Sequence, residues 1–226
     1  MTEHMILDAG GVICLPRAGS WLTTVRFEEI IGPGRLATVT QAEISAAMDA
    51  AAVIYLDESL PITDETMEFA VRRNYFLDLA KRLSWTLTDR EADALARDMT
   101  ENDARYDFYP DARAAIEALG RGRGLYLLSN AMPSLKRVFL NAGLLELFDD
   151  VLISTDVAAA KPDPAVYRAL LDRASLDPAT CCFVDDRLDN LQTARSLGMR
   201  TIHMARGTAS QWPEVANDLL EVARMA

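Results

Sequence analysis

The feature that most constrains the fold is an alternation of short apolar runs with amphipathic segments after residue 105. Three apolar runs lead into polar residues and cover 125–128, 151–155 and 181–184, and a fourth, more polar candidate covers 200–204. Helical periodicity between and before them covers 111–119, 135–141, 164–174 and 188–197. Gly143 and Gly198 stand where a left-handed helix C-cap belongs. Because short buried strands that alternate with helices form right-handed βαβ units, the sequence predicts an α/β fold with a parallel sheet covered on both faces.

The N-terminal apolar run adds a further strand to this set. Residues 5–7 lead directly into Asp8, and Ala9, Gly10 and Gly11 follow at once. A buried strand that ends this way places a carboxylate at the edge of the sheet, with glycine backbone curling round it. A buried carboxylate is costly unless a cation meets it, so we expect a metal ion or a lysine nearby.

Residues 16–104 differ from the rest because they show helix after helix and no clear strand. Helical spacing covers 41–56 and 63–83, and Thr88 with Glu91 forms a capping box before another helix. An all-helical insertion between the first two strands is typical of a lid domain. We predict a core of residues 1–15 and 105–226 and a helical cap of residues 16–104 that closes over the strand ends.

Charge and composition exclude several classes of protein. The 226 residues carry 34 acidic and 23 basic side chains, a formal net charge of -11, which argues against nucleic acid as a partner. No apolar run approaches membrane-spanning length, and the N-terminus lacks the regions of a signal peptide. The cysteines have no zinc-site spacing and are interpreted as reduced core thiols: Cys14, Cys181 and Cys182. We expect a cytoplasmic monomer or homodimer that acts on a small molecule, away from membranes.

Chemistry-bearing residues follow the strands at the edge where open parallel sheets bind ligands. They comprise Asp8, Ser129, Asn130, the segment 156–161, and Asp185 with Asp186. Neighbouring carboxylates repel unless a hard divalent cation lies between them, and oxygen ligands at this density suit Mg²⁺. Lys161 and Ser129 would bind an anion beside that cation. The set predicts phosphoryl transfer, in which Asp8 attacks phosphorus to give an aspartyl-phosphate that water hydrolyses.

In this order the motifs resemble those of the haloacid dehalogenase-like hydrolase superfamily. The matching segments are 8–12, 128–130, 161–164 and 183–190. The resemblance spans the whole chain and implies a Rossmann-like core with a first-type helical cap. The glycine pair before Val12 and the Asp-Asp-x-x-x-Asn form are similar to those of bacterial sugar-phosphate phosphatases. The phosphatase domain of soluble epoxide hydrolases has a similar fourth motif.

The resemblance also implies which residues act on the substrate. Asp8 is the implied nucleophile, and Ser129 and Lys161 complete the catalytic set. Ser129 is equally compatible with a helix N-cap, since helix N-termini favour anions. The implied substrate contacts are Ala9, Gly10, Ser129, Asn130 and Lys161.

A metal site is implied at the same edge. By the family's pattern, the Mg²⁺ ligands are Asp8, the Gly10 carbonyl and Asp186, with Asp185 in support. Asn190 either orients these groups or caps the following helix, and the sequence leaves both open.

One position departs from the family's pattern. Most phosphatases of this family carry a second aspartate two residues after the nucleophile, as acid and base, whereas this chain has Gly10. General acid–base help is typically worth about 100- to 10,000-fold in rate, so a slow enzyme would result. Related members with glycine here are nevertheless regarded as phosphatases. The departure lowers the expected turnover more than it affects the expected fold.

Three functions remain open. The first is a Mg²⁺-dependent phosphatase of a small, sugar phosphate-like metabolite. The second is a 2-haloacid dehalogenase, in which Asp8 attacks carbon and no metal is needed; it would leave Asp185 and Asp186 repelling each other. The third is a non-catalytic protein that binds phosphorylated ligands.

Other side chains carry weaker expectations. His4 and His203 are interpreted as surface or edge residues, because neither lies at the carboxyl end of a strand. The Arg72–Arg73 pair is interpreted as a solvated helix face. The cap offers polar and aromatic candidates for substrate contact, namely Arg17, Trp21, Arg72 and Tyr75.

Overall fold

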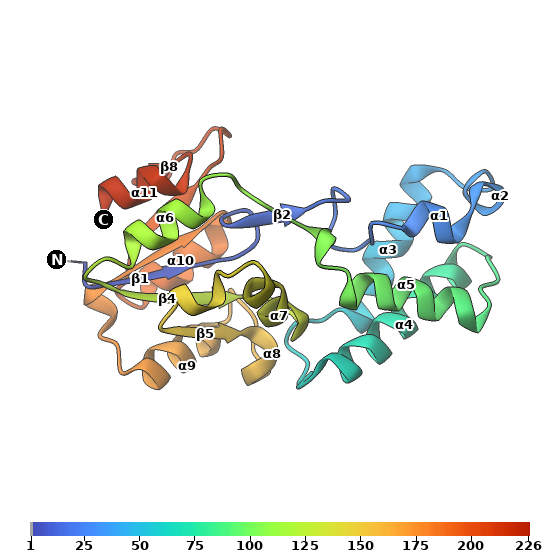
Figure 1. The fold of residues 1–226 in the computed structure, drawn as a ribbon, viewed down its shortest axis with the longest axis horizontal. Coiled ribbons are helices and arrows are strands. Elements are labelled where there is room, and N and C mark those ends of the chain that lie inside the picture. The colour runs from blue at the N-terminus through green and yellow to red at the C-terminus, as the bar shows by residue number, and fades with distance from the viewer. Residues whose placement is uncertain (1) are drawn as a thin grey trace. The chain divides into compact units, whose positions relative to one another are not determined.

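The computed structural model describes residues 2–226 (Figure 1). The chain divides into two compact units, each of which is described by itself. The core unit comprises the N-terminal segment up to Leu15, Glu58–Pro61 and Asp107–Ala226. The cap unit comprises Pro16–Asp57 and Ile62–Tyr106. A mainly helical segment is thus inserted after the first strand of an α/β core, as the sequence predicts.

The core unit is built on a six-stranded parallel sheet with the strand order β5-β4-β1-β6-β7-β8. The strands are β1 (His4–Leu7), β4 (Gly124–Ser129), β5 (Asp150–Ile153), β6 (Cys181–Asp185), β7 (Arg200–Met204) and β8 (Val215–Ala216). β1 lies between β4 and β6, so the residues that follow these three strands meet at one edge of the sheet. The predicted α/β class is confirmed, and β8 is an addition that the sequence did not indicate.

Helices flank this sheet (Figure 1). They are α6 (Ala112–Leu119), α7 (Ser134–Asn141), α8 (Ser154–Val157), α9 (Pro164–Ala174), α10 (Leu188–Ser196) and α11 (Leu219–Met225). Ile6 of β1 and Phe183 of β6 pack with Leu170 of α9 and Leu191 of α10 in one apolar cluster. The adjacent Leu7 points to the opposite face and is also fully buried. Both faces of the sheet are therefore covered, as expected for parallel strands.

Local signals set the ends of these elements. Gly143 and Gly198 have φ values of 63° and 98° just beyond α7 and α10, which confirms the predicted left-handed C-caps. β5 ends at Ile153, earlier than predicted, because the chain turns into α8 at once. α7 begins with Pro133 at its N-cap position, so the N-cap interpretation of Ser129 is wrong. Ser129 is instead the last residue of β4.

The cap unit is an assembly of helices with short connections. They are α1 (Phe27–Ile31), α2 (Pro33–Leu36), α3 (Gln41–Tyr55), α4 (Glu65–Arg82) and α5 (Asp89–Glu101). The capping box of Thr88 with Glu91 starts α5 as predicted, and Thr40 with Glu43 forms a second one at α3. β2 (Cys14–Pro16) and β3 (Tyr106–Phe108) pair where the chain passes between the units. Among residues 2–226, none of the helices combines the length and the apolar composition that a membrane crossing requires.

The interior of the cap unit holds two side chains that the sequence assigned to solvent or substrate. Arg72 is 4% exposed and forms a 2.6 Å ion pair with Glu68, which is fully buried. Tyr75 is fully buried, and its hydroxyl donates to the Leu22 carbonyl at 2.6 Å. The interpretation of Arg72 as part of a solvated face is therefore wrong. Of the four cap candidates, Arg17 and Trp21 are exposed, Trp21 at 36%.

Candidate active site

Three neighbouring strands bring the predicted site residues to one edge of the sheet. Asp8 directly follows β1, and its N–H donates to the Val184 carbonyl of β6 at 3.0 Å. Asp185 ends β6 and Asp186 follows it, while Ser129 ends β4. One carboxylate oxygen from each of Asp8, Asp185 and Asp186 lies within 4.8 Å of the others. The structure therefore forms the acidic cluster that the motifs indicate.

Lys161 enters this cluster from the segment before α9. Its ammonium lies 2.7 Å from Asp8 Oδ1 and 2.8 Å from Asp185 Oδ2, and it donates to the Leu128 carbonyl at 2.9 Å. These acceptors use all three N–H groups of the ammonium. Burial alone would lower the pKa of Lys161, but the Asp185 and Asp8 carboxylates outweigh it and hold the pKa above its usual value. Lys161 is thus a fixed positive charge shared by two carboxylates.

Asn130 holds the backbone of Lys161 in place. Its Nδ2 donates to the Lys161 carbonyl at 2.8 Å, and its Oδ1 accepts from the Lys161 N–H at 2.7 Å. This reciprocal pair links the end of β4 to the segment that carries the ammonium. The geometry gives Asn130 a function in positioning Lys161, while its contact with substrate stays a prediction.

Asp185 is fully buried, and both its oxygens accept hydrogen bonds from several donors. Asn190 Nδ2 lies 3.0 Å from each oxygen, and the Arg187 N–H donates to Oδ1 at 2.8 Å. The Tyr167 hydroxyl donates to the Asn190 carbonyl at 3.0 Å and fixes Asn190 at the start of α10. Of the two functions left open for Asn190, the contacts support the orientation of Asp185, since Arg187 occupies the N-cap position. With Lys161 also bound, Asp185 suits a supporting function.

The carboxylate of Asp186 lies over the second glycine of the first motif. Gly11 has a φ of 71°, and a Cβ built there would lie 2.5 Å from Asp186 Cγ and closer still to Oδ2. The loop is closed by the Ile13 and Cys14 N–H groups, which donate to the Ala9 carbonyl at 2.8 and 3.0 Å. Two features therefore require glycine at position 11. The backbone there is left-handed, and the Asp186 carboxylate fills the space that a Cβ would occupy.

The electrostatics of the cluster show an excess of negative charge. Burial raises the pKa of Asp8 to about 7, with Lys161 opposing the rise and Asp185 and Asp186 adding to it. Burial and the neighbouring Asp185 raise the pKa of Asp186 to about 6. The three carboxylates lie together, and the one buried ammonium beside them pairs with Asp8 and Asp185, so full ionisation of all three needs more positive charge. Clustered carboxylate oxygens are the ligands that hard divalent cations prefer, and these residues fit such an ion.

His203 belongs to this region as well, although the sequence analysis placed it at a surface or an edge. It is 7% exposed, and its Nε2 lies 3.0 Å from the Asp186 carbonyl oxygen. The earlier interpretation is therefore wrong. The pairing of β6 with β7 places His203 beside Asp185, near the carboxyl end of its strand, and the sequence alone does not give this register.

Comparison with known proteins identifies the family. A model of the haloacid dehalogenase-like hydrolases matches residues 3–198. The chain belongs to this family. Similar structures include the L-2-haloacid dehalogenase of Xanthobacter autotrophicus, with a TM-score of 0.69, 19% identity and coverage of 100% of this chain and 98% of that one. Another is a family enzyme of Bacteroides thetaiotaomicron in complex with magnesium and inorganic phosphate. Its TM-score is 0.62 at 16% identity, and the match covers 93% of this chain and 98% of that one.

Curated relatives in the family have more than one activity. A phosphoserine phosphatase of Thermus thermophilus is 39% identical over 51% of this chain and 47% of its own length. A phosphatase of Mycobacterium tuberculosis is 35% identical over 62% of this chain and 64% of its own length. An (S)-2-haloacid dehalogenase of Burkholderia cepacia is 31% identical over 64% of this chain and 58% of its own length. The matches span about half to two thirds of these relatives, and both phosphatase and dehalogenase chemistry are consistent with family membership.

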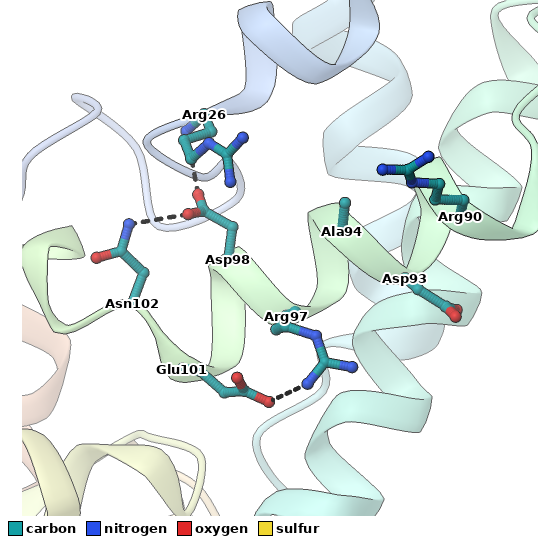
Figure 2. A pocket seen from close by; sticks show the side chains of 8 residues that line it. All are labelled: Arg26, Arg90, Asp93, Ala94, Arg97, Asp98, Glu101 and Asn102. Atoms are coloured by element: carbon teal, nitrogen blue, oxygen red, sulfur yellow. Dashed lines mark hydrogen bonds and ion pairs between the residues drawn. The ribbon is translucent and has the colours of Figure 1, made fainter.

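The cap unit of this family member carries a surface hollow of about 680 Å³ along α5 (Figure 2). Three of its six charged side chains have partners within the hollow's own lining, and two more pair with residues outside it, Arg26 with Glu29 and Asp93 with Arg73. Arg97 pairs with Glu101 at 2.9 Å, and Asp98 accepts from the Arg26 N–H at 3.0 Å and from Asn102 at 2.8 Å. The acidic cluster belongs to the core unit and does not line this hollow. We assign no chemistry to the hollow, because exposed and mutually paired charges are ordinary surface features.

Proposed function

We propose that this protein is a Mg²⁺-dependent phosphatase that hydrolyses a small, sugar phosphate-like metabolite. The observation that carries the proposal is the charge of the cluster, in which Asp8, Asp185 and Asp186 lie together while the ammonium of Lys161 pairs with the first two. A divalent cation would balance that charge, and the two phosphatases among the relatives support the same chemistry. The magnesium and phosphate bound to the structurally similar Bacteroides enzyme give further support.

The hydrogen bonds that each carboxylate already makes indicate which residues would hold the ion. Asp185 is already bonded to Lys161, Asn190 and the Arg187 N–H, whereas Asp186 is bound mainly through its backbone. Asp8 and Asp186 are therefore the proposed direct ligands together with the Gly10 carbonyl, and Asp185 supports them. When bound, the ion would polarise the phosphoryl oxygens and offset their charge.

The chain's own residues account for the covalent steps. A carboxylate oxygen of Asp8 attacks phosphorus, the bond from phosphorus to the ester oxygen breaks, and an aspartyl-phosphate forms. The leaving alkoxide takes a proton from water, because Gly10 offers no acid at the usual position. A second water molecule then attacks the aspartyl-phosphate, releases inorganic phosphate and restores the Asp8 carboxylate. Lys161 holds Asp8 in place throughout at 2.7 Å.

A 2-haloacid dehalogenase is the second candidate, favoured by the Burkholderia relative. In that reaction the Asp8 carboxylate would displace halide from carbon, and water would cleave the resulting ester. The charge of the cluster counts against it, because a metal-free reaction would leave three carboxylates with one ammonium.

Hydrolysis of p-nitrophenyl phosphate by the purified protein tests the proposal. We expect turnover with Mg²⁺, none in excess chelator, and none for a folded Asp8→Asn variant, because an amide is not an effective nucleophile. Halide release from 2-chloropropionate in chelator would instead establish the dehalogenase. Binding of Mg²⁺ and phosphate without any turnover would indicate a non-catalytic member, and unchanged turnover in Asp8→Asn would exclude Asp8 as the nucleophile.

A further inference from the structure

A side chain beyond the four motifs, itself bonded to a second one, holds the backbone of Asp186. His203 of β7 is buried, and its Nε2 lies 3.0 Å from the carbonyl oxygen of Asp186, the residue that follows β6. Its second nitrogen, Nδ1, lies 2.6 Å from Ser210 Oγ in the loop that follows β7. The Trp212 N–H donates to the same Ser210 oxygen at 3.1 Å. These contacts form a continuous chain from the loop, through the ring, to the Asp186 peptide.

The direction of each hydrogen bond follows from the groups involved. A carbonyl oxygen only accepts, so Nε2 of His203 must carry a proton and donate it to Asp186. The Ser210 oxygen accepts from Trp212, which leaves its hydroxyl hydrogen free to point at Nδ1. A His203 ring protonated at Nε2 therefore satisfies every group in the chain, and the ring is held at both ends.

We propose that His203, supported by Ser210, is a positioning residue that fixes the Asp186 peptide and so aims the Asp186 carboxylate at Asp8. This inference rests on the proposed function, because it assigns the carboxylate to a divalent-ion site. The carboxylate itself lies against Gly11, where a Cβ would lie 2.5 Å from Asp186 Cγ. Asp186 is thus held through its peptide by His203, and its carboxylate is bounded by the glycine backbone.

The geometry explains why a ring is needed at this position. Asp185 is oriented directly through its oxygens, by Lys161 and Asn190. Asp186 is restrained differently, because the contact with His203 is made to its carbonyl oxygen. The carboxylate oxygens of Asp186 therefore stay available to an ion.

The variants separate positioning from general stability. His203→Phe keeps a ring in the buried strand and removes both nitrogens, whereas His203→Gln keeps an N–H donor. Ser210→Ala removes the hydroxyl from a half-buried loop residue and should fold normally. Thr201→Val is the matched control, because Thr201 lies two residues before His203 in β7 and also bonds to Trp212, through Nε1 at 3.2 Å.

Calorimetric titration of each purified variant with Mg²⁺ alone, without substrate, gives the decisive measurement. We expect His203→Phe to bind Mg²⁺ about ten-fold more weakly or worse, the usual effect of losing a residue that orients a metal ligand. His203→Gln should recover most of the affinity, Ser210→Ala should lose less than His203→Phe, and Thr201→Val should match the wild type. At saturating Mg²⁺ the kcat of His203→Phe should approach that of the wild type.

Two results would overturn the inference without touching the proposed function. One is wild-type Mg²⁺ affinity in folded His203→Phe, and the other is an equal loss of affinity in Thr201→Val. No Mg²⁺ binding by the wild type would overturn the inference together with the proposed function, so the two failures are distinguishable. If His203→Phe does not fold, ¹⁵N NMR of the wild-type ring still decides, because a His203 without a proton on Nε2 could not donate to Asp186.

Discussion

Substituting Gly11 by alanine tests the geometry of the acidic cluster at a residue that has no functional side chain. The added methyl group would lie 2.5 Å from Asp186 Cγ, whereas ordinary contacts of a Cβ begin at 3.4 Å. The Asp186 carboxylate must therefore retreat by about 1 Å, because the glycine backbone is held by the closed loop. Gly11 also has a φ of 71°, which strains any residue with a side chain.

These two effects have separate magnitudes. The left-handed backbone should cost alanine about 1–2 kcal/mol of folding stability. For a domain of this size, each kcal/mol lowers Tm by about 2–4 °C. A displacement of about 1 Å in an active site can reduce kcat/KM by about 100-fold. Gly11→Ala should therefore lose a few degrees of Tm and most of its activity.

Gly122→Ala provides the control, since Gly122 has a φ of 73° and no atom within 4 Å of a built Cβ. It should show the same loss of Tm with wild-type kcat/KM and Mg²⁺ affinity. The assays are thermal unfolding, hydrolysis of p-nitrophenyl phosphate and Mg²⁺ titration on all three proteins. Wild-type kcat/KM and Mg²⁺ affinity in Gly11→Ala, or an equal loss of activity in Gly122→Ala, would refute the reasoning.

Three further predictions concern charged groups. Lys161→Met should lower the free energy of unfolding by about 3–5 kcal/mol, measured in urea, because two buried carboxylates lose their partner. Asp186→Ala should weaken Mg²⁺ binding more than Asp185→Ala, while Asp185→Ala should lower Tm more, since Asp185 has the buried hydrogen bonds. Arg35 pairs with Glu91 at 2.8 Å and, with the Thr88 N–H, lowers the pKa of that carboxyl to about 2. A lowered pKa stabilises the fold above the unfolded value of 4.5, so the urea midpoints of wild type and Arg35→Ala should converge as the pH falls toward 2.

The edge of the sheet could be predicted because its signals are local. Asp8, Ser129 and Asp185 each end or directly follow an apolar run, and parallel strands bring their carboxyl ends to one edge. Gly143 and Gly198 likewise marked the ends of helices, since a left-handed C-cap requires little beyond glycine.

What the sequence could not supply is the partner of each polar group. Asn130 clamps the backbone of Lys161, 31 residues away, and no spacing rule predicts such a contact. Arg72 is buried because Glu68 lies one turn earlier on the same face of α4, so an ion pair replaces the solvent that a basic residue usually faces. His203 was misplaced for a similar reason, since hydropathy gives the face of a strand but not the carbonyl that a ring will reach.

The fixed charge of Lys161 limits what kind of anion this edge of the sheet can accept. All three of its N–H groups have acceptors, so a substrate gains a hydrogen bond from Lys161 only by displacing Asp8, Asp185 or the Leu128 carbonyl. A phosphate monoester brings a charge of about -1.5 to -2 beside three carboxylates, whereas a 2-haloacid brings a single negative charge. The first therefore needs a counter-charge that Lys161 cannot supply, and a divalent ion is the chemistry that fits. Dependence on Mg²⁺ is the property that separates the two reactions, because a phosphate monoester adds more negative charge to the three carboxylates than a 2-haloacid does.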